Sequence, residues 1–286
     1  MATIENQASL AYRGTVTLSN IVRGEVTSSL TVSKTAVLST YGAGDVVTYV
    51  VTLVNTGDGP VTATTVTDNL GAYAFGTGTL TPLDYVAGSV QYYVNGTLQA
   101  PPTVTQGDGV SFAPITVPAG GNATLVYAAT LNSYAPLGDG ATVTNAVTVS
   151  GGGVCETVFA SATITADATP ELTITKEMEP MALTCGDPVT YTLTVRNYGA
   201  APVPATDNAT VADTLTPPLT ALLVTLDGAP LTEGTDYTYN EQTGDFTTLP
   251  GALPIPAATV TQDPVTGEFT VTPGVAVLTL SGTLAG

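Results

Sequence analysis

The residues of this chain best suited to chemistry are its two lysines. Lys34 and Lys176 are the only lysines among 286 residues, and histidine is absent. Each lysine lies in a run that alternates apolar and polar residues, so its side chain is expected to share the core-facing side of a strand. A buried amine tends to lose its proton and become a nucleophile, which indicates amide chemistry.

An aspartate and an asparagine also fall on core-facing positions of strands that accompany each lysine. A protonated acid can polarise the asparagine carbonyl and relay protons while the amine attacks and ammonia leaves, which gives a spontaneous isopeptide bond. Asp68 and Asp213 would act as the autocatalytic acids. The predicted triads are Lys34, Asp68 and Asn145, and Lys176, Asp213 and Asn6. The alternative is an ordinary ion pair, or a lysine that snorkels at the sandwich edge.

The composition excludes several classes of function. Five basic residues against 23 acidic ones give a net charge of −18, so no basic patch is available for nucleic acid or an anionic membrane. The absence of histidine and the presence of only two cysteines remove most metal sites and histidine-based catalysis. We therefore expect no enzyme, cofactor or metal. Asp45 and Asp187 are interpreted as turn residues rather than calcium ligands.

The elements that must hold these residues are strands. Runs of β-branched and aromatic residues with a period of two, such as residues 47–53 and 143–149, are separated by Gly, Pro, Asn and Asp clusters. Together with the length, this predicts an all-β protein of two tandem sandwiches. No run is long and apolar enough for a membrane span, and the first residues lack the features of a signal peptide.

An internal repeat defines the domain organisation. The motif Lys34, Gly-Asp at 44–45, Asn-Thr-Gly at 55–57 and Val-Thr-Asp at 66–68 recurs at Lys176, 186–187, 197–199 and 211–213. The predicted layout is a donor strand at 1–14, a connector at 15–27, a first repeat at 28–152, an inter-domain segment at 153–168 and a second repeat at 169–286.

These motifs resemble the bacterial surface repeat known as DUF-eleven, an immunoglobulin-like sandwich, and the resemblance covers both copies. It implies a role on the bacterial surface, in adhesins, stalks or appendages. A two-repeat protein of this size also resembles appendage subunits of clostridial spores. The resemblance thus implies an extracellular structural protein on the surface of a cell or spore.

The second repeat lacks the family's final asparagine-bearing strand, and a match lies at the opposite end of the chain. The donor positions that alternate like residues 143–149 are Ile4, Asn6, Ala8 and Leu10. A strand donated to an identical subunit would build a head-to-tail filament, with amide bonds both within and between subunits. The alternative is a monomeric adhesin or stalk module whose N-terminal strand folds back into its own second repeat.

The two cysteines, Cys155 and Cys185, flank the start of the second repeat. We predict a disulfide between them, with free thiols as the alternative.

Overall fold

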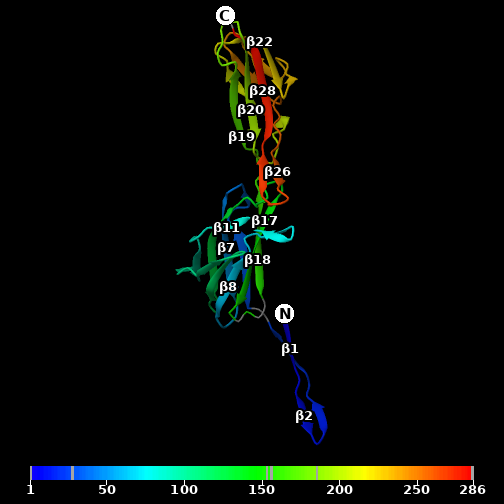
Figure 1. Ribbon diagram of the computed structural model, residues 1–286. Helices are drawn as coiled ribbons and strands as arrows, with labels where there is room; N and C mark the ends of the chain where they lie inside the picture. Colours follow the sequence, from blue (N-terminus) through cyan, green and yellow to red (C-terminus); the bar gives the residue numbers. More distant parts are fainter. Residues whose placement is uncertain (1, 27–28, 153, 155–156, 185, 285–286) are drawn as a thin grey trace. The chain divides into compact units, whose positions relative to one another are not determined.

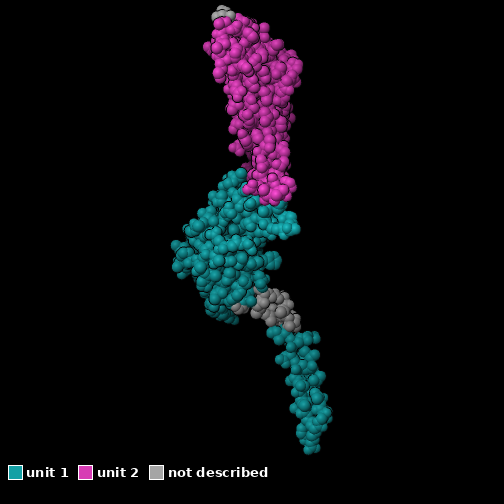
Figure 2. All heavy atoms as spheres, in the orientation of Figure 1, with its two compact units in different colours: residues 1–135, 142–165 teal, residues 136–141, 166–286 magenta. Residues whose placement is uncertain are grey.

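The computed structural model describes residues 2–26, 29–152, 154, 157–184 and 186–284 (Figure 1). Over these ranges the chain is all-β, apart from one 3₁₀ turn at Ala205–Asp207. It divides into two compact units, residues 1–135 with 142–165 and residues 136–141 with 166–286 (Figure 2). The predicted fold class of two tandem β-sandwiches is confirmed. No helix within the described ranges has the length and apolarity of a membrane span.

The first sandwich lies in unit 1 and is complete. One sheet has the order β13-β12-β16-β7-β5, with β11 also paired to β16. Its strands are β5 (Leu30–Ala36), β7 (Val46–Asn55), β11 (Leu83–Tyr85), β12 (Gln91–Val94), β13 (Thr97–Gln99) and β16 (Asn122–Leu131). Alternation along β7 and β16 buries Tyr49 and Tyr127 in the core, as period-two patterning requires.

The second sheet of this sandwich has the order β14-β15-β8-β17-β18-β6. Its strands are β6 (Thr40–Tyr41), β8 (Val61–Asp68), β14 (Thr103–Gln106), β15 (Val110–Val117), β17 (Thr142–Gly151) and β18 (Val158–Ala166). A short ribbon, β9 (Tyr73–Phe75) with β10 (Gly78–Leu80), stands apart. β17 also packs across the sandwich against β5.

The interpretation of residues 153–168 as an inter-domain segment was wrong for most of its length. Residues 158–166 form β18, which pairs with β17 over its whole length. Ile164 is fully buried, because the alternation Phe-Ala-Ser-Ala-Thr-Ile turns every second side chain inward. The first repeat therefore ends with a hairpin of two strands.

The second sandwich lies in unit 2 and has fewer strands. One sheet has the order β19-β20-β28-β22-β23, and the other has only β21-β25-β24. The bounds are β19 (Leu172–Glu179), β20 (Pro188–Asn197), β21 (Ala212–Thr214), β22 (Leu219–Leu226), β23 (Ala229–Pro230), β24 (Tyr237–Tyr239), β25 (Asp245–Thr248) and β28 (Gly274–Leu284). β26 (Thr259–Gln262) and β27 (Phe269–Thr272) form a separate ribbon.

The N-terminal segment is a two-stranded ribbon rather than a single strand with an irregular connector. β1 (Ala2–Asn6) pairs with β4 (Val22–Val26), and β2 (Ser9–Tyr12) pairs with β3 (Thr15–Leu18). Arg13 and Gly14, both at positive φ, turn the chain between β2 and β3, which suits a tight hairpin. The prediction of a flexible connector at 15–27 overlooked this turn. β1 to β4 are called the N-terminal ribbon below.

Candidate crosslink sites

The first predicted triad is brought together inside the first sandwich. Lys34 lies on β5, Asp68 ends β8, and Asn145 lies on β17, the neighbour of β8. The Lys34 Nζ donates a hydrogen bond to Asp68 Oδ2 at 2.5 Å, and both side chains are 0% exposed. Asn145 is also fully buried. The interior orientation predicted for all three residues is therefore confirmed.

The Asp68 carboxyl group receives further hydrogen bonds. The Leu70 backbone N–H donates to Oδ1 at 2.7 Å, and the Tyr127 hydroxyl donates to Oδ2. Burial raises the pKa of Tyr127 well above its ordinary value, so this hydroxyl stays protonated and remains a donor. These partners fix the carboxyl group between the lysine and the phenol.

The Lys34 amine lies among aromatic rings as well as beside Asp68. Its Nζ is 4.6 Å from the centre of the Tyr49 ring and 5.9 Å from that of Tyr127. Burial lowers the pKa of Lys34 from 10.5 to about 8, against the opposing effect of Asp68. The lowered pKa increases the fraction of the amine that is unprotonated, and therefore nucleophilic, near neutral pH.

Asn145 is the unusual member of the site. Neither its Oδ1 nor its Nδ2 has a hydrogen-bond partner among the described residues, and the Tyr49 hydroxyl also has none. Asn145 lies near enough to Tyr49 to offset part of the rise in the Tyr49 pKa that burial causes, but no bond of normal geometry joins them. Leaving a buried polar group unpaired costs about 1–3 kcal/mol, so this carboxamide calls for an explanation.

Sequence reasoning missed the two tyrosines of this site. Both lie at inward positions, Tyr49 on β7 and Tyr127 directly opposite on β16. The signal was present, because Tyr49 ends the Gly-Asp-x-Val-Thr-Tyr motif and recurs as Tyr191. A buried tyrosine also brings into the core a hydroxyl that prefers a polar partner.

The second predicted triad is only partly assembled. The Lys176 Nζ donates to Asp213 Oδ2 at 2.5 Å and lies 4.5 Å from the Tyr191 ring centre. Asn6 is elsewhere, paired with Val22 in the N-terminal ribbon. Leu280, not tyrosine, pairs with Tyr191 at the position that Tyr127 holds opposite Tyr49. Asp213 therefore lacks the phenol that Asp68 has.

The core-facing side of β19 is open, as the predicted lack of a final strand implies, and Lys176 is only partly enclosed there. Its side chain is 37% exposed, and on the same face Leu172 is 45% exposed where its counterpart Leu30 is 2% exposed. Ile174 is exposed too. The cause is a missing cover, because β17 packs on β5 but no described strand occupies that place over β19. Leu172, Ile174 and Lys176 are called the acceptor face below.

The edge beside the acceptor face is unpaired in the described chain. β8 pairs with β15 on one side and with β17 on the other, whereas its counterpart β21 pairs with β25 alone. The backbone groups on the free side of β21 have no strand partner within the ranges given above. This edge and the acceptor face together form an open site for one or more strands.

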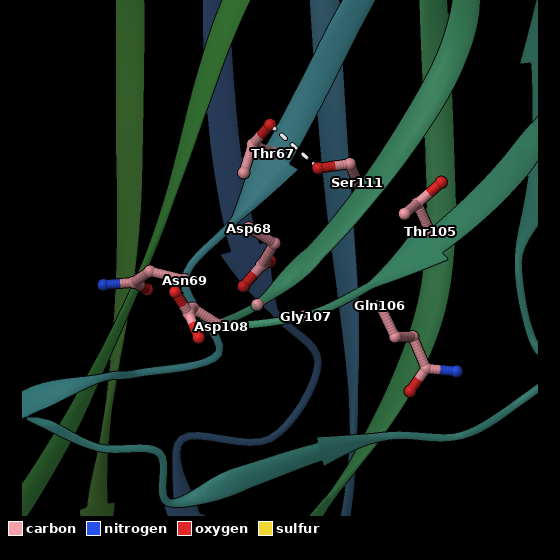
Figure 3. A pocket seen from close by; sticks show the side chains of 9 residues that line it. Thr67, Asp68, Asn69, Thr105, Gln106, Gly107, Asp108 and Ser111 are labelled. Carbon is pink, nitrogen blue, oxygen red and sulfur yellow. Dashed lines mark hydrogen bonds between the residues drawn. The ribbon is translucent and has the colours of Figure 1, made fainter.

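A hollow of about 310 Å³ opens beside the end of β8 (Figure 3). It is lined by Thr67, Asn69 and the turn at residues 105–109. On one side the hydroxyl groups of Thr67 and Ser111 form a hydrogen bond of 3.1 Å. Although Asp68 borders the hollow, the residue is fully buried, so solvent does not reach the Lys34–Asp68 pair from here. The hollow is therefore not an entrance to the buried triad.

The remaining predicted residues lie in turns or outside the residues that the structure describes. Asp45 and Asp187 accept the backbone N–H groups of Gly42 and Thr184 at 2.7 Å, as turn residues do. Cys155 and Cys185 lie outside the described residues, so their disulfide stays a prediction.

Among solved structures, the chain is similar to the pilus backbone protein of Streptococcus pneumoniae, with 13% identity, a TM-score of 0.34, and coverage of 85% of this chain and 55% of that one. It is similar to the major pilin subunit of Bacillus cereus, with 11% identity, a TM-score of 0.34, and coverage of 95% and 73%. It also matches red sea bream transglutaminase, with 14% identity, a TM-score of 0.31, and coverage of 87% and 31%.

The chain thus spans about half the length of the streptococcal pilus protein and less than a third of the transglutaminase. No protein-family profile and no curated protein matches the chain, so membership of the DUF-eleven family stays a prediction.

Proposed function

We propose that this protein is the structural subunit of an extracellular filament that polymerises head-to-tail with identical subunits. The observation that carries the proposal is the open site of the second sandwich, where the acceptor face is exposed beside the unpaired edge of β21. An uncovered apolar face beside a free strand edge is what β-strand addition fills. In the first sandwich, β17 fills the same place.

The N-terminal ribbon supplies a strand with the right pattern. Ile4, Asn6, Ala8 and Leu10 match Val143, Asn145, Val147 and Val149 of β17. Ile4 and Leu10 are exposed in the free ribbon, so insertion would remove apolar surface from water at about 25 cal/mol per Å². Donor and acceptor are different surfaces, so the contact does not close on itself and extends into a filament.

Inside the first sandwich the geometry supports an amide between Lys34 and Asn145. A proton passes from the Lys34 ammonium to Asp68, and the free amine attacks Cγ of Asn145. The bond from Cγ to Nδ2 then breaks, and Nδ2 leaves as ammonia with the proton relayed through Asp68. Asn145, which has no hydrogen-bond partner among the described residues, would gain a covalent one.

The same chemistry would join subunits. Once the donor strand of a neighbour covers the acceptor face, its Asn6 takes the position that corresponds to Asn145 of the first sandwich. Lys176 and Asp213 already form a close pair, as Lys34 and Asp68 do. Covering the face would also desolvate Lys176, which favours its unprotonated form. The filament would then be covalently linked from one subunit to the next.

A monomer that inserts its own ribbon into its second sandwich is the rival. The extracellular setting on a cell or spore surface and the DUF-eleven relationship belong to the same proposal.

The test is the behaviour of assembled material boiled in SDS with reductant. Wild-type filaments should give a ladder of multimers, whereas Asn6→Ala and Lys176→Ala should give monomers. Asn20→Ala, in the same ribbon but outside the predicted donor positions, is the matched control and should keep the ladder. Wild-type filaments that dissolve wholly to monomers rule out the covalent link. Filaments that form without residues 1–14 rule out the donor strand.

A further inference from the structure

The gap in the second sandwich is wider than one strand. In the first sandwich β8 is followed across the sheet by β17, β18 and β6, whereas among the described residues nothing follows β21. The counterpart of β6, residues 182–183, is not a strand. Because β17 and β18 form one antiparallel hairpin, the complete first sandwich is closed by a hairpin and not by a lone strand.

The N-terminal ribbon is also an antiparallel hairpin, and the pairing between β1 and β4 corresponds to that between β17 and β18. Asn145 pairs with Ala162 across β17 and β18, and Asn6 pairs with Val22 across β1 and β4. In the chain, β17 and β18 come directly before β19, the first strand of the second sandwich. The ribbon comes directly before β5, the first strand of the first sandwich.

Between β1 and β4 the ribbon has two chemically different faces. Residues that pair directly share a face, so Ile4, Asn6 and Val22 lie together on one side. Glu5 and Arg23 lie on the other side, where the Arg23 Nε and Glu5 Oε1 form an ion pair at 2.7 Å. The hairpin of β17 and β18 is built in the same way, with Asn145 and Val143 turned inward and Thr144 and Thr163 bonded to each other outside.

We propose that the whole ribbon of a second copy, and not a single strand, fills the open site, an inference that rests on the proposed head-to-tail assembly. β1 and β2 take the place of β17 beside β21. β4 takes the place of β18 and pairs on its outer side with the segment after β19. Residues 15–26 are then part of the joint between subunits, not a free tether.

Charge favours this occupant. The ribbon holds Arg13 and Arg23, two of the five basic residues, with Glu5 and Glu25, two of the 23 acidic ones. It is neutral, and the net charge of −18 lies wholly in the rest of the chain. A neutral hairpin can approach a strongly acidic sandwich of another copy without the repulsion that a second sandwich would meet.

The register gives a crosslink that only the ribbon arrangement allows. The Thr165 N–H donates to Ser39 O at 2.9 Å between β18 and the segment beside it. The matching residues are Glu25 of the ribbon and Met181, which is 90% exposed. Backbone-bonded partners lie about 5.5 Å apart at Cα, within disulfide range. The double variant Glu25→Cys with Met181→Cys should therefore form a disulfide in filaments.

Equal amounts of ¹⁵N-labelled and unlabelled full-length double variant are assembled and mapped by non-reducing peptide mass spectrometry. We expect the 25–181 peptide pair, about half of it joining a labelled to an unlabelled chain. Glu25→Cys with Val265→Cys is the control, since Val265 is also 86% exposed but lies in the turn between β26 and β27. The inference is overturned if residue 25 forms a disulfide with residue 265 as readily as with residue 181. It is also overturned if the 25–181 disulfide is found only within single chains.

Two charge-matched substitutions provide an independent measurement. Val22→Asp and Arg23→Gln each lower the net charge by one, on the apolar and the polar face of the ribbon respectively. We expect Val22→Asp to reduce the pelleted filament fraction at least tenfold and Arg23→Gln to change it less than twofold. If both variants assemble like wild type and still require residues 1–14, the ribbon inference fails while the donor strand stands. If wild type itself never forms filaments, the proposed function fails.

Discussion

At Lys34, burial lowers the pKa of the amine and the neighbouring Asp68 carboxylate raises it, and burial has the larger effect. The pKa of Lys34 in the folded protein is therefore about 8, below its value of 10.5 in water. The unfolded chain binds more protons than the folded one between these two values, so stability rises with pH across that window. The variant Asn145→Ala, in which no amide can form, allows this pH dependence of stability to be measured.

In Asn145→Ala, we expect the Lys34 Nζ to titrate near pH 8. The chain has only two lysines, so ¹⁵N-lysine NMR can resolve the Lys34 signal. The free energy of unfolding of the first sandwich should increase by up to about 3 kcal/mol from pH 8 to 10.5. A Lys34 titration at 10 or above would contradict the desolvation described here.

The Lys34–Asn145 amide predicts a mass lower by about 17 Da, one ammonia, in the wild-type protein. Asp68→Ala should restore the full mass, because no acid remains to relay the proton. Tyr127→Phe removes one hydrogen bond to Asp68 and should slow bond formation about tenfold without preventing it. Intact mass spectrometry over time after refolding measures both.

Tyr92→Phe is the matched control for Tyr127→Phe, because its hydroxyl bonds the Thr116 backbone far from the triad. It should leave the rate of amide formation unchanged. An unmodified mass in natively folded wild-type protein would refute the amide and leave the fold untouched.

At the scale of elements, β5 and β19 are counterparts that differ in what covers them. Leu30→Ala should lower the free energy of unfolding of the first sandwich by about 2–5 kcal/mol, since Leu30 is buried. Leu172→Ala should cost the monomer less than about 1 kcal/mol, because the side chain is already half exposed. Denaturant unfolding of both variants measures this difference.

Leu172→Ala, which has the smaller effect on monomer stability, should have the larger effect on filament assembly. Leu172→Ala removes part of the acceptor face and should slow filament growth several-fold. Equal loss of monomer stability at both positions would mean that β19 is covered within the chain, and would favour the folded-back monomer.

At the scale of the whole molecule, subunits of net charge −18 repel one another. The screening length falls from about 30 Å at 0.01 M salt to about 8 Å at 0.15 M, so repulsion between approaching subunits weakens. We expect filament growth, followed by light scattering, to speed up several-fold over this range. A growth rate that falls as salt is added would show instead that electrostatic attraction, such as that of Arg23 for an acidic surface of another subunit, controls how subunits approach.

The sequence by itself determined the all-β fold, the two repeats and the pairing of each lysine with its aspartate. These features follow from local rules, because alternation fixes which side chains share a face and recurring motifs fix which positions correspond. Lys34, Asp68 and Lys176, Asp213 could be matched without coordinates for that reason. Knowing which residue occupies each strand position was enough to match each lysine with its aspartate.

Only the tertiary structure decided which faces are covered. Leu30 and Leu172 lie in equivalent patterns, yet one is buried and the other exposed, because burial depends on a strand from elsewhere in the chain. The position of β17 beside β8 likewise depends on strand pairing between distant segments. Such pairing has no local signature strong enough to choose among the many possible partners.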